Sequence, residues 1–338
     1  MGNRKPIVNS DLIPWLLEKD NSSVRYLTLT QLLGKSVADR KVQEAKQNIM
    51  KIGSIPDILA KQKPGGFWEK HEDFYLRTKY KGTVWQLIIL AELGADGQDP
   101  RIQKAVEFIL AISQDRQSGG FSYDGTQKNG GQHSKVLPCL TGNMAWSMIK
   151  FGYLDDPRIQ QGIDWIVRHQ RYDDGILTPP KGWPYEKLEK CWGRHTCISG
   201  VAKALKALAE IPPEKRTREV KLCLEEGSEF LLKHHIYKRS HNLRRVSKPK
   251  WLKLAFPTVW DTDVLEILEI LIKLGYRDRR MQDALDLIIS KQTEEGWWLL
   301  EQTYNGRFQV NIEQKGKPSK WITFRALKVI KDFGQDDD

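Results

Sequence analysis

The sequence has no long apolar run and little cysteine. No stretch approaches the roughly 18 consecutive apolar residues that a membrane-spanning helix needs, and residues 1–6 lack the apolar core of a signal peptide. Four cysteines in 338 residues are too few for a disulfide scaffold. Acidic residues are also fewer than basic ones, 43 against 54, which gives a net charge of +11. We therefore expect a cytoplasmic protein whose charge suits nucleic acid, an anionic membrane surface or a phosphorylated molecule equally well.

The chain does contain an internal repeat. Four apolar stretches each end in a glutamine that a glycine turn follows, and these glutamines are Gln62, Gln114, Gln170 and Gln292. The first three lie 52 and 56 residues apart, and the last gap of 122 residues spans two periods. The missing member falls at residues 230–234, where His234 replaces the glutamine. Such a period indicates a repeated structural unit.

Each period contains one helix that is apolar around its whole circumference and one that is amphipathic. The apolar helices are expected at residues 83–93, 141–149, 195–209 and 264–274, and the amphipathic ones at 101–113, 158–170, 218–235 and 279–292. The first kind is typical of a helix enclosed by others, and the second of a helix that faces water. Further helices are expected at residues 11–17, 24–33, 42–50 and 321–333.

These helices predict an all-α fold, an (α/α)6 toroid of six inner and six outer helices. We expect a single domain over residues 1–338, with N-terminal helices in residues 1–57 and the repeats in residues 58–338. The helix at residues 11–17 would supply the outer partner of the last inner helix. An open solenoid of helix pairs is the alternative.

The glutamine-to-glycine-Trp turns resemble the repeat motif of squalene-hopene and oxidosqualene cyclases. Residues 256–265, Phe-Pro-Thr-Val-Trp-Asp-Thr-Asp-Val-Leu, are similar to the Ser-Pro-Val-Trp-Asp-Thr segment at the head of one of their inner helices. Their acid motif is Asp-x-Asp-Asp, and this chain has Asp261-Thr262-Asp263-Val264 in its place. The resemblance implies a toroidal fold and an isoprenoid substrate.

A second segment resembles the β subunit of protein farnesyltransferase. Residues 194–200, Arg-His-Thr-Cys-Ile-Ser-Gly, are similar to a stretch whose His is a zinc ligand in that family. Cys139 stands 56 residues before His195, about where the family has its zinc-binding Cys, although Leu137 occupies the position of the zinc-binding Asp. The chain also resembles bacterial and archaeal proteins described only as prenyltransferase-like or squalene-cyclase-like.

Four residues are candidate metal ligands on their own chemistry, namely Cys139, Cys191, His195 and Cys197. Cys191 and His195, at positions i and i+4, would share one face of a helix. A thiolate-rich set favours zinc over magnesium, and an iron-sulfur cluster is a further alternative. A structural clamp, or cysteines that simply pack in the core, are the competing interpretations.

Asp261 and Asp263 begin the fifth inner helix. A protonated carboxylic acid there could start a carbocation cascade, and carboxylates could instead orient a metal ligand or bind a magnesium diphosphate. Asp261 is the better candidate for ordinary helix capping, and Asp263 for chemistry.

Aromatic and basic residues complete the predicted site. Five tryptophans on or beside inner helices could line a cavity that holds an apolar chain: Trp85, Trp146, Trp192, Trp260 and Trp321. Packing in the protein core is the competing interpretation for each of them. Eight cations and no acid occur between Lys233 and Lys253, among them Arg244 and Arg245, and we expect this segment beside the metal ligands and Asp263. Lys135 and His133 are weaker candidates for the same anionic group.

We predict an enzyme of the isoprenoid cyclase and prenyltransferase type, with a hydrophobic isoprenoid, as its diphosphate, in the central cavity and a Cys/His zinc site at the rim. The first alternative is a non-catalytic scaffold, or a protein that binds a hydrophobic ligand, with a structural metal. The second is an anionic or nucleic-acid partner bound by the basic rim, for which the chain has no recognised motif. A protein partner and peripheral contact with a membrane are further expectations.

Overall fold

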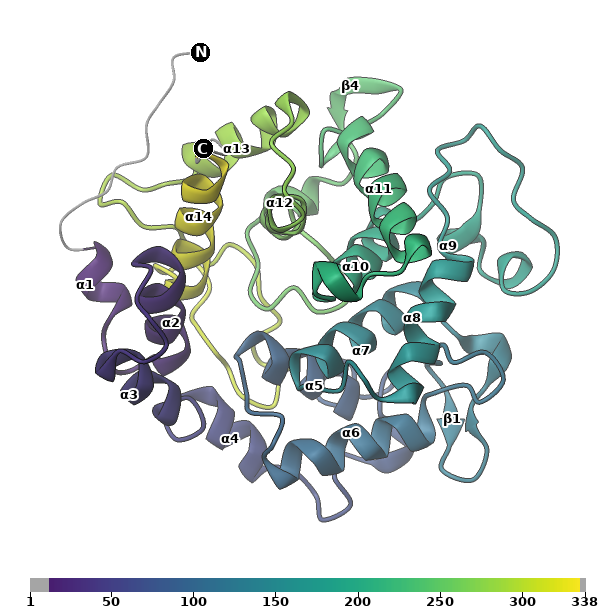
Figure 1. Cartoon of the computed structure of the whole chain (residues 1–338), viewed down its shortest axis with the longest axis horizontal. Helices are drawn as coiled ribbons and strands as arrows, with labels where there is room; N and C mark the ends of the chain where they lie inside the picture. The colour runs from purple at the N-terminus through teal and green to yellow at the C-terminus, as the bar shows by residue number, and fades with distance from the viewer. Residues whose placement is uncertain (1–11, 335–338) are drawn as a thin grey trace. The chain divides into compact units, whose positions relative to one another are not determined.

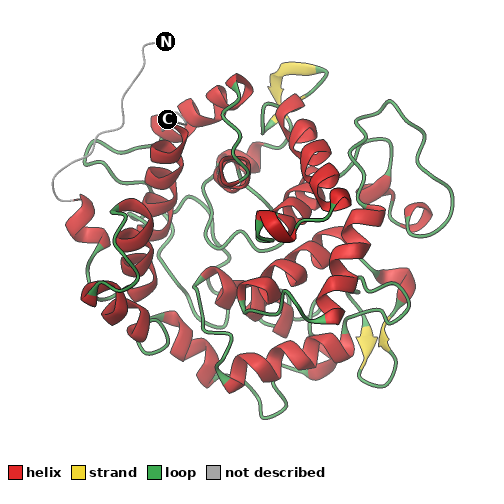
Figure 2. Cartoon of the chain, in the orientation of Figure 1, coloured by secondary structure: helices red, strands yellow, loops and turns green. Residues whose placement is uncertain are grey.

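The computed structural model describes residues 12–334, and almost all of their regular structure is helical (Figure 2). The all-α prediction is therefore confirmed. The contacts of the chain divide it into two units. One contains the residues up to Ala60, His234–Thr258 and the chain from Asp263 onward, and the other contains Lys61–Lys233 and Val259–Thr262. Asp11, the first residue of a predicted helix, lies outside the described residues. None of the described helices is long and apolar enough to cross a membrane.

The unit formed mainly by Lys61–Lys233 holds three inner and three outer helices (Figure 1). Its α-helices are α5 (Thr83–Glu92), α6 (Pro100–Ile112), α7 (Pro138–Lys150), α8 (Pro157–His169), α9 (Glu189–Trp192), α10 (Ile198–Leu208) and α11 (Arg218–Lys233). Short 3-10 helices lie at His71–Asp73, His133–Lys135, Tyr185–Lys187 and Pro213–Lys215, and β1 (Gly125–Thr126) pairs antiparallel with β2 (Gly130–Gly131).

Burial follows the predicted pattern of inner and outer helices in this unit. Almost every residue of α5, α7 and α10 is buried, and α7 packs against both α5 and α10. In contrast, α6, α8 and α11 bury one face, and each covers one inner helix. An inner helix without a polar face is stable only when other helices bury it on all sides.

The other unit carries both described ends of the chain. Its elements are α1 (Leu12–Leu16), α2 (Ser22–Leu27), a π-helix (Thr28–Leu32), α3 (Arg40–Asn48), α4 (Ser54–Ala60), β3 (Lys238–Arg239), β4 (Asn242–Val246), 3-10 helices at Pro249–Leu252 and Arg279–Met281, α12 (Val264–Lys273), α13 (Gln282–Ser290) and α14 (Lys320–Phe333). The strands β3 and β4 pair antiparallel, with Lys238 opposite Val246.

The N-terminal helices pack against the last helix, α14, in this unit. The nearly buried ammonium of Lys320, at the start of α14, donates to Glu18 Oε2 at 2.7 Å and to a carboxylate oxygen of Asp20. The same ammonium lies 5.6 Å from the ring centroid of Trp15 in α1, and Trp15 packs edge-on against Trp297 at 4.5 Å. The first and last described helices therefore share one packed interface.

The glutamine that follows an outer helix contacts the next outer helix in the first two periods, whereas Gln170 donates to the Arg171 carbonyl and Gln292 to that of Gly296. Gln62 Nε2 donates to the carbonyl of Arg101 at 2.8 Å, and Gln114 Nε2 donates to the carbonyl of Arg158 at 2.6 Å. Each carbonyl belongs to the first turn of the next outer helix. Gln114 Nε2 also donates to the Gly119 carbonyl of its own glycine turn at 3.0 Å. One amide group thus connects two outer helices and the turn between them.

Close packing explains the glycine in these turns. Gly66 and Gly119 have φ values of +84° and +82°, which favour glycine. A Cβ atom on Gly66 would lie 2.5 Å from the carbonyl oxygen of Lys104, and one on Gly119 would lie 2.7 Å from that of Gln161. The turn can approach the next outer helix only without a side chain.

The aromatic residue after each glycine is tied to the next inner helix. A backbone N–H donates to a threonine hydroxyl in the first or second turn of that helix, in the pairs Trp68 with Thr83 (3.2 Å), Phe121 with Thr141 (2.9 Å) and Trp298 with Thr323 (3.0 Å). All three aromatic side chains are fully buried. This contact fixes where each inner helix begins.

Replacing Gln114 with Ala should lower the free energy of unfolding by roughly 1–3 kcal/mol, because one buried and one partly buried carbonyl lose their donor. Urea denaturation measures the loss. Gln117→Ala, on an exposed side chain in the same turn, is the matched control and should change stability little. Equal effects of the two substitutions would contradict the structural role of Gln114.

Candidate functional site

Three cysteines lie near the N-terminal ends of inner helices in the unit formed mainly by Lys61–Lys233. Cys139 is the second residue of α7, Cys197 precedes α10 as its N-cap, and Cys191 lies in α9. The backbone N–H of Cys197 donates to the carbonyl of Cys191 at 3.3 Å. All three cysteines are half-buried and form no disulfide.

Burial keeps the thiols of Cys139 and Cys191 protonated. It is the main reason why the pKa of Cys139 rises to about 12, and the neighbouring Cys191 and Cys197 raise it further while Lys203 lowers it. Burial likewise raises the pKa of Cys191 to about 11, and the pKa of the adjacent Tyr75 well above its ordinary value. A thiolate is the form that binds metals and attacks electrophiles, so both thiols are poorly reactive in this environment.

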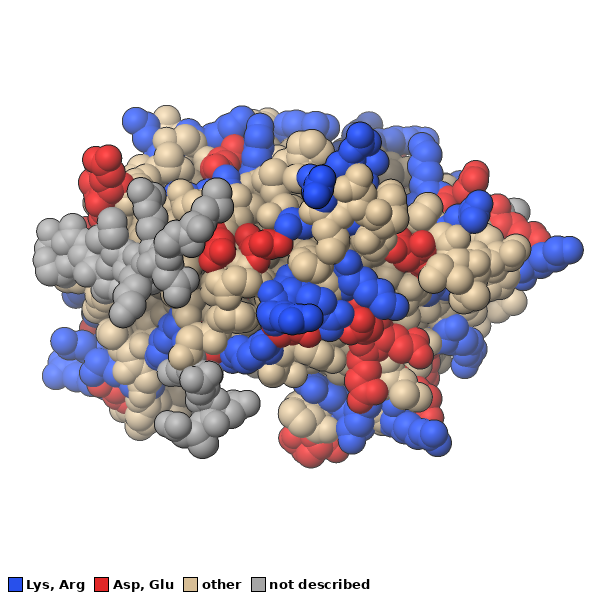
Figure 3. Space-filling view, turned by 90° about the horizontal axis from the view of Figure 1, so that it is seen from above, with Lys and Arg blue, Asp and Glu red and all other residues tan. Residues whose placement is uncertain are grey.

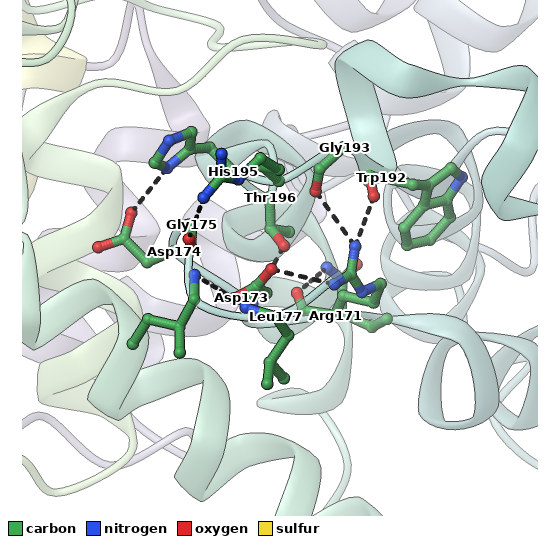
Figure 4. Close-up of polar contacts among 12 residues, drawn as sticks. Arg171, Asp173, Asp174, Gly175, Leu177, Trp192, Gly193, His195 and Thr196 are labelled. Atoms are coloured by element: carbon green, nitrogen blue, oxygen red, sulfur yellow. Dashed lines mark hydrogen bonds and ion pairs between the residues drawn. The ribbon is translucent and has the colours of Figure 1, made fainter. Parts of the chain in front are cut away.

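The side chain of His195 lies against the loop that precedes α9, beside Asp174 and Gly175 (Figure 4). Its Nδ1 atom lies 3.3 Å from Asp174 Oδ1, and the two residues form an isolated antiparallel bridge. The imidazole also packs over Gly175, where a Cβ atom would lie 2.6 Å from its Cε1. The side chain of His195 is 62% exposed.

A buried ion pair holds the loop in this position (Figure 4). Arg171 Nη2 donates to Asp173 Oδ2 at 3.1 Å, and Arg171 Nη1 donates to the carbonyls of Trp192 and Gly193. The backbone N–H of Thr196 donates to the Asp173 carbonyl at 2.9 Å. These contacts keep residues 194–196 extended. The prediction of a helix from His195 is therefore wrong by three residues, since α10 begins at Ile198.

The predicted ligand set does not fit a metal in this arrangement. Among residues 12–334, no three His, Cys, Asp or Glu side chains are grouped so that they could hold one ion. His195 and Cys191, expected on one helical face, lie on different sides of the turn between α9 and α10. Zinc, an iron-sulfur cluster and magnesium therefore stay predictions from the sequence, and no chemical step is assigned to them.

Thiol labelling tests this environment. In a chelator at neutral pH, Cys139 and Cys191 of the folded protein should react with iodoacetamide about 100-fold or more slowly than in urea, because their raised pKa leaves little thiolate. Mass spectrometry of tryptic peptides measures each rate. A protein that holds stoichiometric zinc and becomes reactive only in chelator would instead support the zinc prediction.

Asp261 and Asp263 have different surroundings although they are close in sequence. Asp261 Oδ1 accepts hydrogen bonds from the Ser199 hydroxyl of α10 at 3.2 Å and from the N–H of Thr262 at 3.0 Å. Asp263 is the N-cap of α12: its Oδ1 accepts the N–H of Glu266 and its Oδ2 that of Ala255, both at 2.8 Å. The helix cap is thus Asp263, and its assignment to Asp261 is wrong.

Asp263 is the more perturbed acid of the predicted site. Its side chain is almost fully buried, and this burial raises its pKa to about 6, against the opposing effects of Arg325 and of the two backbone N–H groups. Arg325 is itself paired with Glu269 through Nε at 2.9 Å and 2.8 Å. Asp263 is consequently protonated in part of the molecules near neutral pH.

This pKa predicts a pH dependence of stability. Between pH values of about 4 and 6 the folded protein binds more protons at Asp263 than the unfolded chain does, so stability falls as the pH rises. The free energy of unfolding of the wild type should drop relative to Asp263→Asn by up to roughly 3 kcal/mol across this range and then stay level. Urea denaturation at several pH values measures it. A constant difference would contradict the raised pKa.

The predicted tryptophans are all buried or half-buried, but they do not form one group. Trp85 stacks on Tyr75 at 4.6 Å, and Trp192 packs against Trp165 and Tyr185. Trp260 Nε1 donates to the Tyr80 hydroxyl at 3.0 Å.

Trp146 and Trp321 lie apart from these. Trp146 is near the C-terminal end of α7, where Lys206 Nζ lies 3.9 Å from its ring centroid, so it is at the opposite end of the helix from Cys139. Trp321 stacks on Phe256 at 4.3 Å. A single aromatic wall made of the five predicted residues is not evident in either unit.

Two buried amides escaped the sequence analysis. Gln86 in α5 donates through Nε2 to the Tyr80 carbonyl at 2.9 Å, and Asn143 in α7 donates through Nδ2 to the Val259 carbonyl at 3.2 Å. The side-chain oxygens of both residues are buried and accept no hydrogen bond. Buried acceptors almost always have a donor, so these oxygens mark positions where a ligand could bind. Their signal in the sequence is a single amide inside an otherwise apolar helix.

The other predicted anion-binding residues are engaged with acids. Lys135 Nζ donates to Asp124 Oδ2 at 2.5 Å, and His133 Nδ1 lies 2.6 Å from Asp115 Oδ2. The ring of His133 also stacks on Trp183, with 3.8 Å between the centroids. Neither side chain is open to a diphosphate without breaking an ion pair.

The basic segment between Lys233 and Lys253 forms the exposed hairpin of β3 and β4. Arg244 and Arg245 are exposed, whereas Lys238 pairs with Asp283 in the first turn of α13. The start of α13 follows the C-terminal end of α12, so the hairpin is not beside Asp263 as expected. The residue that contacts Asp263 is Ala255, two positions beyond the basic segment. On the face seen in Figure 3, basic side chains are scattered among acidic ones.

A groove of about 790 Å³ lies elsewhere, between α8 and the start of α11. Its apolar lining includes Ile163, Val167, Ile211 and Val220. It is formed by the outer helices and contains none of the predicted site residues.

Comparisons with known proteins give a distant structural likeness only. No protein-family model matches the chain, and no curated protein matches it in sequence. Among solved structures, it is similar to the type II terpene cyclase MstE from Scytonema without ligand, at 13% identity over 84% of this chain and 96% of that chain, with a TM-score of 0.31.

A variant of MstE with its substrate geranylgeranyl dihydroxybenzoate gives 14% identity over 85% and 97% of the two chains, with a TM-score of 0.30. Another, with the product merosterolic acid A, gives 12% identity over 85% and 96%, with a TM-score of 0.31. TM-scores at this level do not establish a common fold.

Proposed function

We propose that the protein is an enzyme of the terpenoid cyclase and prenyltransferase type that binds a hydrophobic isoprenoid among its inner helices, and that Asp263 is the acid that protonates it. The six helix pairs would close into an (α/α)6 toroid. The packing of the N-terminal helices against α14 through Lys320 supports closure, because it leaves no free end on the last inner helix.

The observation that carries this proposal is the buried acid at the head of α12. A carboxyl group that burial keeps partly protonated near neutral pH can donate a proton to an alkene or epoxide. Glu266, next to it, raises the pKa further, and its own Oε1 accepts the Thr258 hydroxyl at 2.7 Å. A perturbed acid within a segment that resembles the cyclases is the expected mark of a catalytic group.

Helix capping is compatible with this role. The N–H groups of Ala255 and Glu266 each bind one oxygen of Asp263, and a carboxyl oxygen has a second lone pair. The two bonds hold the carboxyl group in one orientation, so an isoprenoid placed beside it would meet a fixed donor.

A non-catalytic protein that binds a hydrophobic ligand is the second candidate. Both oxygens of Asp263 already accept backbone N–H groups, which favours the carboxylate and a purely structural role. The unmatched amide oxygens of Gln86 and Asn143 would then bind a polar group of the ligand without chemistry.

Asp263→Asn distinguishes the two candidates. Asn still caps α12 but cannot donate a carboxylic proton, so turnover should fall about 100-fold or more while binding is retained. The probes are squalene and geranylgeranyl diphosphate in detergent, with binding followed by tryptophan fluorescence and products by mass spectrometry.

Asp278→Asn is the matched control, because Asp278 also caps a short helix but is not buried. Its turnover should equal that of the wild type. Binding without conversion by the wild type would support the ligand-binding protein. Failure of the wild type to bind either probe would contradict the proposed isoprenoid function.

A further inference from the structure

One turn of the repeat exposes the residues that its counterparts bury. Each turn has a glycine with positive φ followed two positions later by a large apolar residue, in the pairs Gly66 with Trp68, Gly119 with Phe121, Gly175 with Leu177 and Gly296 with Trp298. The three aromatic residues are 0% exposed, whereas Leu177 is 63% exposed and its neighbour Ile176 is 85% exposed. Among the described residues, Ile176 is the most exposed of the large hydrophobic side chains.

The exposed turn is held firmly, so its exposure is a built feature. In the other turns the aromatic N–H binds a threonine of the next inner helix. Here the N–H groups of Ile176 and Leu177 bind Asp173 Oδ1 instead, at 3.2 Å and 3.0 Å. Asp173 is buried and paired with Arg171, which in turn binds the loop backbone beyond α9 (Figure 4). This anchor presents two adjacent aliphatic side chains to solvent in a fixed geometry.

We propose that Ile176 and Leu177 form a membrane-contact tip that inserts into the interfacial region of a lipid bilayer. Two side chains offer far less area than the roughly 800 Å² per partner that a stable protein interface buries. A bilayer needs no complementary surface, and the strength of binding at its interface grows with the apolar area inserted and with the attraction of basic residues to anionic lipid. Pro179 and Pro180 follow the tip, and the chain at these residues forms no helix or strand that could bury it.

Charges around the membrane-contact tip fit the headgroup layer. Arg194 is exposed and donates through Nη2 to the carbonyl of Gly175 at 3.1 Å, which places a guanidinium at the base of the tip. The nearest acids are engaged, since Asp173 pairs with Arg171 and Asp174 faces His195. Residues 181–190 of this loop contain three lysines and two glutamates, so the loop has a small excess of positive charge. The aliphatic pair supplies the apolar contact, and Arg194 adds a modest preference for anionic lipid.

The choice of a bilayer as the partner rests on the proposed function. An isoprenoid substrate partitions into membranes, so a protein that takes it up gains from residing at the lipid surface. The contact itself needs no catalysis and can be tested without a substrate.

Co-sedimentation of the full chain with vesicles tests the proposal. The vesicles are phosphatidylcholine alone or an equal mixture with phosphatidylglycerol. We expect the wild type to bind both, and the double substitution Ile176→Ser with Leu177→Ser to weaken binding about tenfold or more. Arg194→Gln should reduce only the preference for the anionic mixture. Absence of wild-type binding, or equal binding by the double variant, would overturn the proposal.

Two controls separate this outcome from a failure of the proposed function. Val37→Ser changes a comparably exposed side chain, 64% exposed, in the turn before α3, and should bind vesicles like the wild type. The double variant should bind geranylgeranyl diphosphate in detergent like the wild type, because the membrane-contact tip is not part of the ligand site. Loss of vesicle binding by Val37→Ser would contradict a tip confined to Ile176 and Leu177.

Discussion

The hydrogen bond from Gln114, at the end of one outer helix, to the first turn of the next outer helix is the constraint that organises the middle of the repeat. Gln114 binds the Arg158 carbonyl and its own glycine turn together, so the turn can run only inward. The buried aromatic that follows then fixes the start of an inner helix through Thr141. The inner helices are thereby held in register, and their N-terminal ends carry the groups of the candidate site.

Burial shapes the chemistry of these groups in one common way. It raises the pKa of Cys139 and Cys191 and that of Asp263, because a charged form is costly where few polar groups solvate it. For a thiol the consequence is an inert side chain. For a carboxylic acid it is a proton donor close to neutral pH. Burial therefore makes thiolate chemistry unfavourable at Cys139 and Cys191, and it leaves Asp263 partly protonated.

The helices were predictable from the sequence because their apolar pattern is local. For example, α5 and α12 begin at the expected residues, Thr83 and Val264. His195 was misplaced because its position depends on Asp174, 21 residues away, and on the buried pair behind it. The second oxygen of Asp263 binds the backbone N–H of Ala255, outside the helix, and no periodicity reveals this contact. Trp146 lies eight residues into α7, so the sequence alone could have placed it away from the helix start.

Everything proposed for the site depends on the protonation state of Asp263, because a protonated carboxyl group can act as an acid whereas an ionised one is a structural helix cap. A ¹³C NMR titration of the side-chain carboxyl carbons, with Asp263→Asn used to assign the resonance, measures its pKa directly. We predict a midpoint near 6 in the folded protein. A midpoint at or below the ordinary value of 3.8 would mean a permanently ionised helix cap and would contradict the assignment of Asp263 as the acid.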